Sequence, residues 1–193
     1  FASAMGRHGI GDRTYVVAYD DAGGATSGRL VVMLRSLGMR ASVLDGGMAA
    51  WGGSLETGAG DTPEPAMFTP RPWPLDRYAS LGEVSAVANG SDRQTVLLDA
   101  RAADRYRGET EPIDPRAGHI PGALNAPWAA NIDPSSGRFR TPAELRALYA
   151  QHGIAEQTDV ICSCGSGVRP SRSHQARNAS GTHCTASPRC VST

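Results

Sequence analysis

The chain has 193 residues, of which 40% are hydrophobic and 20% charged, proportions typical of one globular domain or two small ones. Its 19 basic and 19 acidic residues give no net charge, which argues against a protein that binds nucleic acid or a membrane surface. The longest strictly apolar runs, over 15–19 and 30–34, are too short to span a membrane, and the first residues lack the features of a secretory signal.

The first segment predicts a strand, a helix and a second strand, in that order. Residues 15–19 form an apolar run rich in Val and Tyr, as in a buried strand. Residues 27–37 carry apolar side chains at helical spacing, and residues 42–44 predict the second strand. Because two strands joined by a crossover helix run parallel, we expect this segment to belong to an α/β sheet covered on both faces.

A stretch rich in Gly and Pro over 53–75 has little periodicity, and we interpret it as an inter-domain linker. Beyond it, residues 80–88 begin with the Ser and Glu of a capping box and predict a helix. Residues 141–153 begin with Thr, Pro and Glu in the corresponding positions and predict a second helix. The other predicted elements are strands at 96–99 and 159–163, a helical turn at 102–106 and an extended piece within 119–125.

The pattern stops after Val168. Residues 169–193 contain one large apolar residue, Val191, and no acidic residue, so no helix or strand with a buried face can be drawn from them. Their mixture of Arg, Ser, Pro, His and Thr is what a GC-rich gene would encode in a shifted reading frame. We interpret 169–193 as a non-native tail, with a genuine disordered tail as the alternative.

Cysteine is confined to the last quarter of the chain, which favours thiols in a reducing compartment such as the cytoplasm over a secreted disulfide scaffold. Cys164 follows the predicted strand 159–163 and opens the turn CGSGV. Parallel α/β sheets present reactive groups at this edge, and the two glycines let backbone N–H groups converge on an anion. Such a turn lowers a thiol pKa from its usual value of about 8.5, so Cys164 is a candidate nucleophile, whereas Cys162 is expected to be a buried thiol.

Five short motifs, in order along the chain, resemble the rhodanese sulfurtransferases of the tandem two-domain type. They are DGGMAAW at 45–51, DAR at 99–101, RYRG at 105–108, GHIPGALN at 118–125 and CGSGV at 164–168. The last motif is similar to the loop of the mercaptopyruvate sulfurtransferase branch, which runs Cys-Gly-Ser-Gly-Val-Thr. The resemblance extends over roughly residues 8–168.

The resemblance implies an α/β fold of two rhodanese-like domains with parallel central sheets and flanking helices. Residues 1–52 would be the remnant of a non-catalytic first domain, in which Asp20 stands where the second domain carries its nucleophile. Residues 76–168 would be the catalytic domain, without its last helix and strand. Because that loss would expose a sheet edge and apolar faces, we expect weak or no activity from this chain.

The resemblance also implies a reaction and its residues. Cys164 would take a sulfur atom from thiosulfate or 3-mercaptopyruvate as a persulfide, and cyanide or a thiol would remove it. The substrate-binding residues that it implies are Arg105, Arg116, Gly165, Ser166, Gly167 and Val168. Asp99 and Arg101 are expected to hold the strand end together, and His119 to be structural. The expected partners are a small anionic donor and a thiophilic acceptor, for a monomer that uses no cofactor or metal and binds neither nucleic acid nor membrane.

Other functions fit the pattern less well. A phosphatase or arsenate reductase loop of related fold needs an arginine at position 170, which is Pro170 here. A zinc site would have to use Cys162, Cys164, His183, Cys184 and Cys190, whose spacing is not that of a structural zinc site. The main alternative is a non-catalytic sulfur carrier or interaction module, which turnover with cyanide would distinguish from an enzyme.

Overall fold

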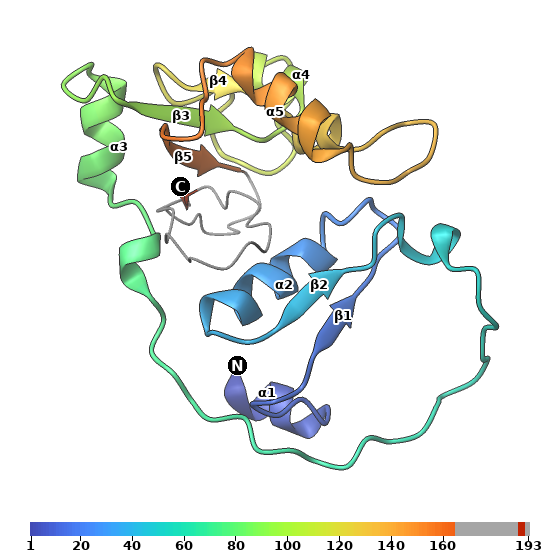
Figure 1. Ribbon diagram of the computed structural model, residues 1–193. Helices are drawn as coiled ribbons and strands as arrows, with labels where there is room; N and C mark the ends of the chain where they lie inside the picture. The colour runs from blue at the N-terminus through green and yellow to red at the C-terminus, as the bar shows by residue number, and fades with distance from the viewer. Residues whose placement is uncertain (165–188, 192–193) are drawn as a thin grey trace. The chain divides into compact units, whose positions relative to one another are not determined.

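The computed structural model describes residues 1–164 and the backbone of residues 189–191 (Figure 1). The chain divides into two compact units. Unit 1 consists of Phe1–Pro74 together with Asp133–Phe139, and unit 2 of Leu75–Ile132 together with Arg140–Thr193. Among the described residues, no helix combines the length and the apolar character needed to cross a membrane.

Unit 1 is built on a pair of parallel strands. Its elements are α1 (Ala2–Arg7), β1 (Val16–Ala18), α2 (Ser27–Ser36), β2 (Ala41–Val43) and a short 3-10 helix at Gly47–Ala50. The strands pair in parallel with Val17 opposite Ser42, which confirms the predicted strand–helix–strand unit. The expected cover on both faces is wrong for this unit, because Tyr15, Val17 and Tyr19 are 50–56% exposed on the face opposite α2 and the core. The helix α2 buries Val31 and Leu34 in the core of the unit, as its apolar spacing predicts.

The second half of the predicted linker packs on unit 1. Residues 53–74 contain no helix or strand, but the Phe68 side chain is buried in the core of unit 1 and Trp73 packs against that core. The backbone N–H of Ala66 donates to the Gly6 carbonyl at 2.9 Å, and that of Asp12 donates to the Met67 carbonyl at 3.1 Å. The Pro-rich composition therefore indicates an extended chain here, and two aromatic side chains attach this chain to the unit.

Unit 2 contains a four-stranded parallel sheet in the order β4-β3-β5-β6. Its strands are β3 (Thr95–Asp99), β4 (Leu124–Asn125), β5 (Asp159–Ser163) and β6 (Arg189–Val191), and its helices are α3 (Leu81–Ala88), α4 (Ala103–Arg107) and α5 (Pro142–Ala150). Short 3-10 helices lie at Leu75–Arg77 and Trp128–Asn131. A parallel sheet with these crossover helices confirms the predicted α/β fold class.

Alternate side chains of the central strands enter two cores on opposite faces of this sheet. Leu97 and Ile161 pack with Val84 of α3, whereas Leu98 and Cys162 pack with Tyr149 of α5. This alternation follows from the two-residue period of a strand. Both central strands are apolar on both faces, because helices cover both faces of the sheet.

The two predicted capping boxes are confirmed. At α3 the Glu83 amide donates to Ser80 Oγ at 3.2 Å, and the Ser80 amide donates to the Glu83 carboxylate at 2.8 Å. At α5 the same pair of contacts joins Thr141 and Glu144. Each box satisfies amides that a helix N-terminus leaves without intrahelical partners, so a local signal was sufficient to place these two helix starts.

One prediction about the end of the chain is wrong. The sequence pattern indicated no strand within 169–193, so the second domain was expected to lack its last strand. The structure shows instead that Arg189–Val191 form the strand β6, which pairs in parallel with β5. The register places Cys190 opposite Cys162. A strand ladder is made of backbone N–H and C=O groups, so a segment can pair without the apolar pattern on which the prediction relied. The rest of that predicted tail lies outside the described residues.

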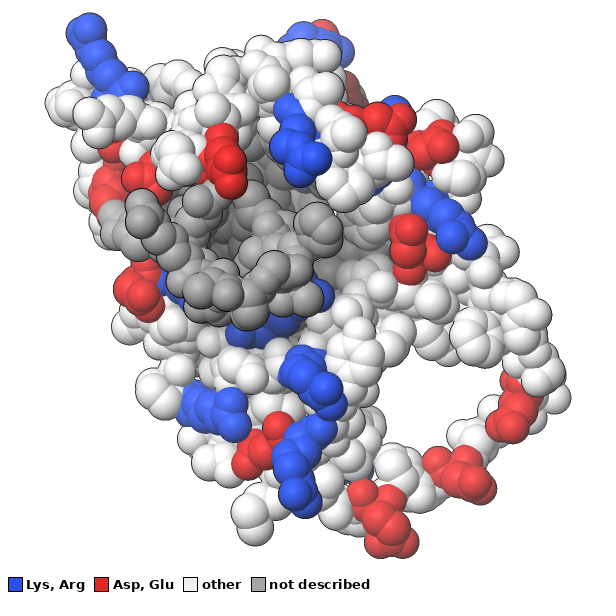
Figure 2. Space-filling model, in the orientation of Figure 1, with Lys and Arg blue, Asp and Glu red and all other residues white. Residues whose placement is uncertain are grey.

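Positive and negative side chains are interspersed on the face of the molecule that Figure 2 shows. This distribution agrees with the zero net charge of the sequence.

Candidate functional site

The carboxyl edge of the sheet in unit 2 carries Cys164 directly after the central strand β5. Asp99 of β3 lies opposite Ser163 of β5 in the parallel register, and the Ala100 amide donates to the Ser163 carbonyl at 2.9 Å. Cys164 thus leaves the sheet beside the segment that begins at Ala100. This edge, where strands end and loops begin, is the usual location of ligand sites in α/β sheets.

The two cysteines of this strand have different environments. Cys162 is only 6% exposed in the apolar core beneath α5, as predicted, and Cys164 is half-buried at the strand end. Burial, and to a smaller extent the nearby charge of Cys164, raise the pKa of the Cys162 thiol far above its usual range. Cys162 is therefore a neutral core side chain at physiological pH, which leaves Cys164 as the better candidate for a thiolate.

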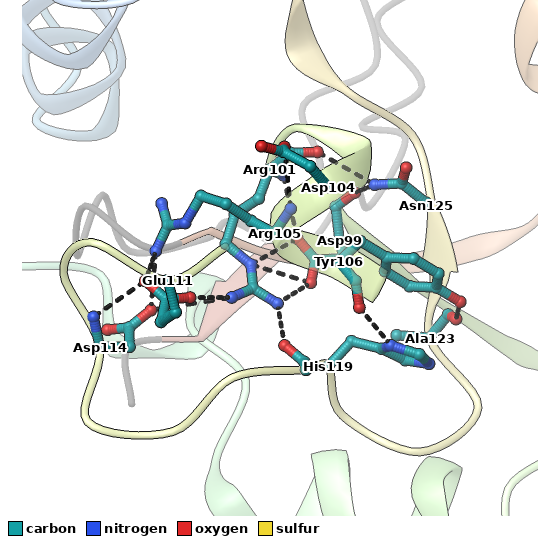
Figure 3. A network of polar contacts seen from close by, with 11 residues as sticks. Asp99, Arg101, Asp104, Arg105, Tyr106, Glu111, Asp114, His119, Ala123 and Asn125 are labelled. Carbon is teal, nitrogen blue, oxygen red and sulfur yellow. Dashed lines mark hydrogen bonds and ion pairs between the residues drawn. The ribbon is translucent and has the colours of Figure 1, made fainter. Parts of the chain in front are cut away.

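Arg101 connects the end of β3 to the loop that precedes β4 (Figure 3). Its guanidinium contacts both oxygens of Asp99 at 2.6–3.0 Å, donates to Glu111 at 3.1 Å and donates to the Gly118 carbonyl at 2.6 Å. Asp99 is almost fully buried, and the Arg101 side chain is 9% exposed. The predicted role of this pair in holding the strand end together is confirmed.

Arg105, a predicted substrate-binding residue, already contacts two carboxylates. Its Nη2 donates to Glu111 Oε1 at 2.6 Å and to Asp114 Oδ2 at 3.0 Å. Its Nε is buried and has no hydrogen-bond partner among the described residues. Arg105 also lines a cavity of about 390 Å³ at this loop. The side chain is held in place before any substrate arrives.

Of the other predicted substrate-binding residues, the structure describes Arg116 but not the residues that follow Cys164. Arg116 is exposed, and within the described part of the chain its side chain makes no hydrogen bond or ion pair. The predicted loop residues, namely Gly165, Ser166, Gly167 and Val168, lie outside the described residues, so their part in the site stays a prediction.

His119 lies on the ring of Tyr106 at the loop before β4. The two rings are stacked with centroids 3.7 Å apart, and Nδ1 of His119 lies 2.7 Å from the Tyr106 carbonyl oxygen. The hydroxyl of Tyr106 donates to the Ala123 carbonyl at 2.7 Å. These contacts connect α4 to the start of β4 and support the predicted structural role of His119.

Sequence reasoning missed Glu111 and Asp114, which bind the two arginines. The signal that could have revealed them is their position: two carboxylates in the short loop after RYRG, within reach of both guanidinium groups. No cluster of potential metal ligands occurs within the part of the chain that the structure describes. For the zinc alternative, His183, Cys184 and the side chain of Cys190 lie outside that part.

The corresponding edge of unit 1 carries Asp20 in a turn between β1 and α2. Its carboxylate accepts four backbone N–H bonds of 2.7–3.1 Å, from Ala22, Gly24, Thr26 and Ser27. Partial burial raises the pKa of Asp20, but these four donors lower it by more, so the pKa lies well below its usual range. The turn is thus an anion-binding nest occupied by the protein's own carboxylate.

We expect Asp20→Asn to destabilise the chain by about 1–2 kcal/mol near pH 7, since the amide replaces a charged acceptor of four N–H bonds. A carboxyl whose folded pKa is depressed stabilises the fold above its unfolded pKa of about 3.9, and this contribution is lost as pH falls below that value. The difference between wild type and variant should therefore shrink in acid, as measured by urea unfolding at pH 7 and pH 3. Asp21→Asn is the matched control, and an equal effect of both substitutions would contradict the prediction.

Several known proteins are similar to this chain in sequence. The rhodanese-like domain matches residues 83–186 of the chain. A putative thiosulfate sulfurtransferase, SseB of Mycobacterium tuberculosis, is 38% identical over 84% of this chain and 57% of its own length. A probable 3-mercaptopyruvate sulfurtransferase of Pseudomonas aeruginosa is 39% identical over 83% of this chain and 57% of its own length. The chain thus spans little more than half the length of these curated relatives.

A solved structure shows the same fold. The crystal structure of SseA from Escherichia coli, described as a 3-mercaptopyruvate sulfotransferase with the rhodanese fold, superposes on this chain with a TM-score of 0.72 at 32% sequence identity. The similarity covers 86% of this chain and 62% of that chain.

Proposed function

Because this chain belongs to the rhodanese-like domain family, we propose that it is a sulfurtransferase with Cys164 as its nucleophile. The observation that carries the proposal is the position of this residue. Cys164 is half-buried at the carboxyl end of the central strand β5 and precedes the sequence Gly-Ser-Gly, whereas its neighbour Cys162 is enclosed in the core. The relatives named as thiosulfate or 3-mercaptopyruvate sulfurtransferases support the same reaction class.

The proposed reaction has two steps. The Cys164 thiolate attacks the outer sulfur of thiosulfate, breaks its S–S bond and displaces sulfite. With 3-mercaptopyruvate it attacks the thiol sulfur and the C–S bond breaks. The carbon fragment leaves as the enolate of pyruvate, which becomes pyruvate when its carbon takes up a proton. The enzyme is then a persulfide. In the second step cyanide or a thiolate attacks the terminal sulfur and restores the Cys164 thiolate, with thiocyanate or a new persulfide as product.

Backbone amides of the turn at 165–168 are proposed to stabilise the thiolate and the departing anion. The donors are small anions, and guanidinium groups bind carboxylate and sulfonate oxygens well. Arg116 is exposed and makes no described contact, which leaves it available for such a donor. We propose Arg105 as the second donor-binding arginine.

Weak turnover is a further expectation, because residues 169–193 carry no apolar pattern for the helix whose N-terminus would help to hold the thiolate. The alternative function is a sulfur carrier or interaction module without turnover. This alternative is supported by Asp20. In unit 1 this residue occupies the position that corresponds to the nucleophile, and its carboxylate cannot accept sulfur. The cytoplasmic location and the monomeric state stay predictions.

Mass spectrometry of the intact chain tests the proposal. Incubation with 3-mercaptopyruvate or thiosulfate should add one sulfur atom, which peptide mapping should locate on Cys164. Subsequent release as thiocyanate on addition of cyanide supports the enzyme. A stable persulfide without turnover supports the carrier. The absence of any added sulfur at Cys164 would overturn both the enzyme and the carrier and would favour the interaction module.

A further inference from the structure

The arginine cluster of unit 2 carries more negative than positive charge. Arg101 and Arg105 supply two positive charges, while Asp99, Glu111 and Asp114 supply three negative ones, all joined by contacts of 3.7 Å or less (Figure 3). An anionic ligand is attracted by net positive charge, and this cluster is net negative. An oxygen of the sulfur donor that binds Arg105 Nη2 therefore has to replace one of the two carboxylates that this atom already contacts.

Glu111 is the carboxylate that is held firmly. Its Oε1 accepts Arg105 Nη2 at 2.6 Å and the backbone amides of Ile113 and Asp114 at 3.1 and 2.9 Å, and its Oε2 accepts Arg101. The side chain is 6% exposed. The Asp114 amide, followed by Arg105, lowers the pKa of Glu111 to about 2. Removal of Glu111 from Arg105 would break several of these contacts together.

Asp114 is held less firmly. Its carboxylate is 3.0 Å from Arg105 Nη2 and 3.7 Å from Arg101 Nη1, and its side chain is 23% exposed. It is the more exposed of the two carboxylates on Arg105, so it can move to solvent at lower cost than Glu111.

The surroundings of Arg105 provide space for an incoming anion. Arg105 and Glu111 line the cavity of about 390 Å³, which Ala102, Asp104, Thr110 and Pro112 complete. The buried Nε of Arg105 still lacks an acceptor among the described residues. A second oxygen of the bound anion could accept a hydrogen bond from this N–H group, which neither Glu111 nor Asp114 contacts.

We propose that Asp114 is an internal competitor of the sulfur donor, whose carboxylate occupies the position on Arg105 that a carboxylate or sulfonate oxygen of the donor takes. This inference depends on the proposed sulfurtransferase function and adds a residue that sets donor affinity. No bond is made or broken in the exchange: one anion leaves the guanidinium and another replaces it. Asp114 thus weakens donor binding and leaves the sulfur chemistry at Cys164 unchanged.

Anion binding to a chain that cannot react tests this exchange directly. In a Cys164→Ser background, pyruvate and thiosulfate are titrated calorimetrically into the chain with Asp114 intact, with Asp114→Asn and with Asp114→Glu. Asp114→Asn should tighten binding by about fivefold or more, because it removes a full charge that competes at close range. Asp114→Glu keeps the charge and should not tighten binding.

The matched control is Glu109→Gln, which removes one negative charge from the same loop at a residue that pairs with Arg107. If Glu109→Gln tightens binding as much as Asp114→Asn does, the effect is general electrostatics and the proposal is overturned. Unchanged or weaker binding in Asp114→Asn overturns it as well.

Steady-state kinetics on the chain that retains Cys164 separate this inference from the proposed sulfurtransferase function. Asp114→Asn should lower KM for the anionic donor about fivefold and leave kcat within twofold, since it changes ground-state competition alone. If Cys164 gains sulfur in wild type while KM does not respond to Asp114→Asn, the competitor role fails and the sulfurtransferase stands. If Cys164 never gains sulfur in any variant, the sulfurtransferase proposal fails first.

Discussion

Cys164→Ser is expected to reduce thiocyanate formation by a factor on the order of 10³ or more, because a hydroxyl cannot form a persulfide and covalent catalysis is lost. The measurement is the rate of thiocyanate production from 3-mercaptopyruvate or thiosulfate with cyanide. The mass of the intact variant after incubation with donor should show no added sulfur.

Cys162→Ser is the matched control, since it makes the same substitution two residues earlier on the same strand. Cys162 is in the apolar core, so we expect a loss of stability of about 1–3 kcal/mol from the buried hydroxyl and little change in the rate per folded molecule. Persulfide on Cys162, or sulfur transfer that survives Cys164→Ser, would remove the basis for Cys164 as nucleophile.

Elements with strong local signals could be predicted from the sequence. The strand β5 was predicted with the bounds that the structure shows, because an apolar run between turn residues marks a buried parallel strand. The helix starts at Ser80 and Thr141 were predicted because a capping box is contained within four residues. Such signals depend on short-range contacts and leave little room for tertiary structure to override them.

Features that depend on distant contacts were not predictable in the same way. The pairing of β6 with β5 is a backbone contact between segments that are far apart in the sequence, 159–163 and 189–191. No side-chain pattern indicated it. The burial of Phe68 in unit 1 likewise depends on which surface the extended chain meets. Composition describes how a segment behaves alone, and these two segments take their structure from partners elsewhere in the chain.

In the candidate site, too, the features set by local sequence were predictable and those set by distant contacts were not. The position of Cys164 directly after a strand follows from the predicted bounds of β5, which the structure shows. Arg105 was singled out as a donor-binding cation, but the sequence motif did not indicate that Glu111 and Asp114 neutralise it. Whether an arginine is available to a ligand depends on its ion-pair partners, which the fold brings together.

Arg101→Met is expected to destabilise the chain by about 3–5 kcal/mol, the usual result of removing one partner from a buried charge cluster. The substitution keeps much of the side-chain volume but removes the guanidinium that donates to Asp99, Glu111 and the Gly118 carbonyl. Because Asp99 is almost fully buried, water cannot replace the lost contacts without opening the strand end. Urea unfolding of the full chain provides the measurement.

Arg107→Met provides the contrast, because Arg107 and its partner Glu109 form an exposed ion pair on the same segment. Its loss should leave the unfolding midpoint almost unchanged. The double variant Arg101→Met with Asp99→Asn should recover part of the stability that Arg101→Met loses, since it removes the buried charge that the first substitution leaves unpaired. Equal midpoints for Arg101→Met and Arg107→Met would mean that the cluster contributes nothing to the strand end. The carboxyl edge that presents Cys164 would then have to be held by backbone pairing alone.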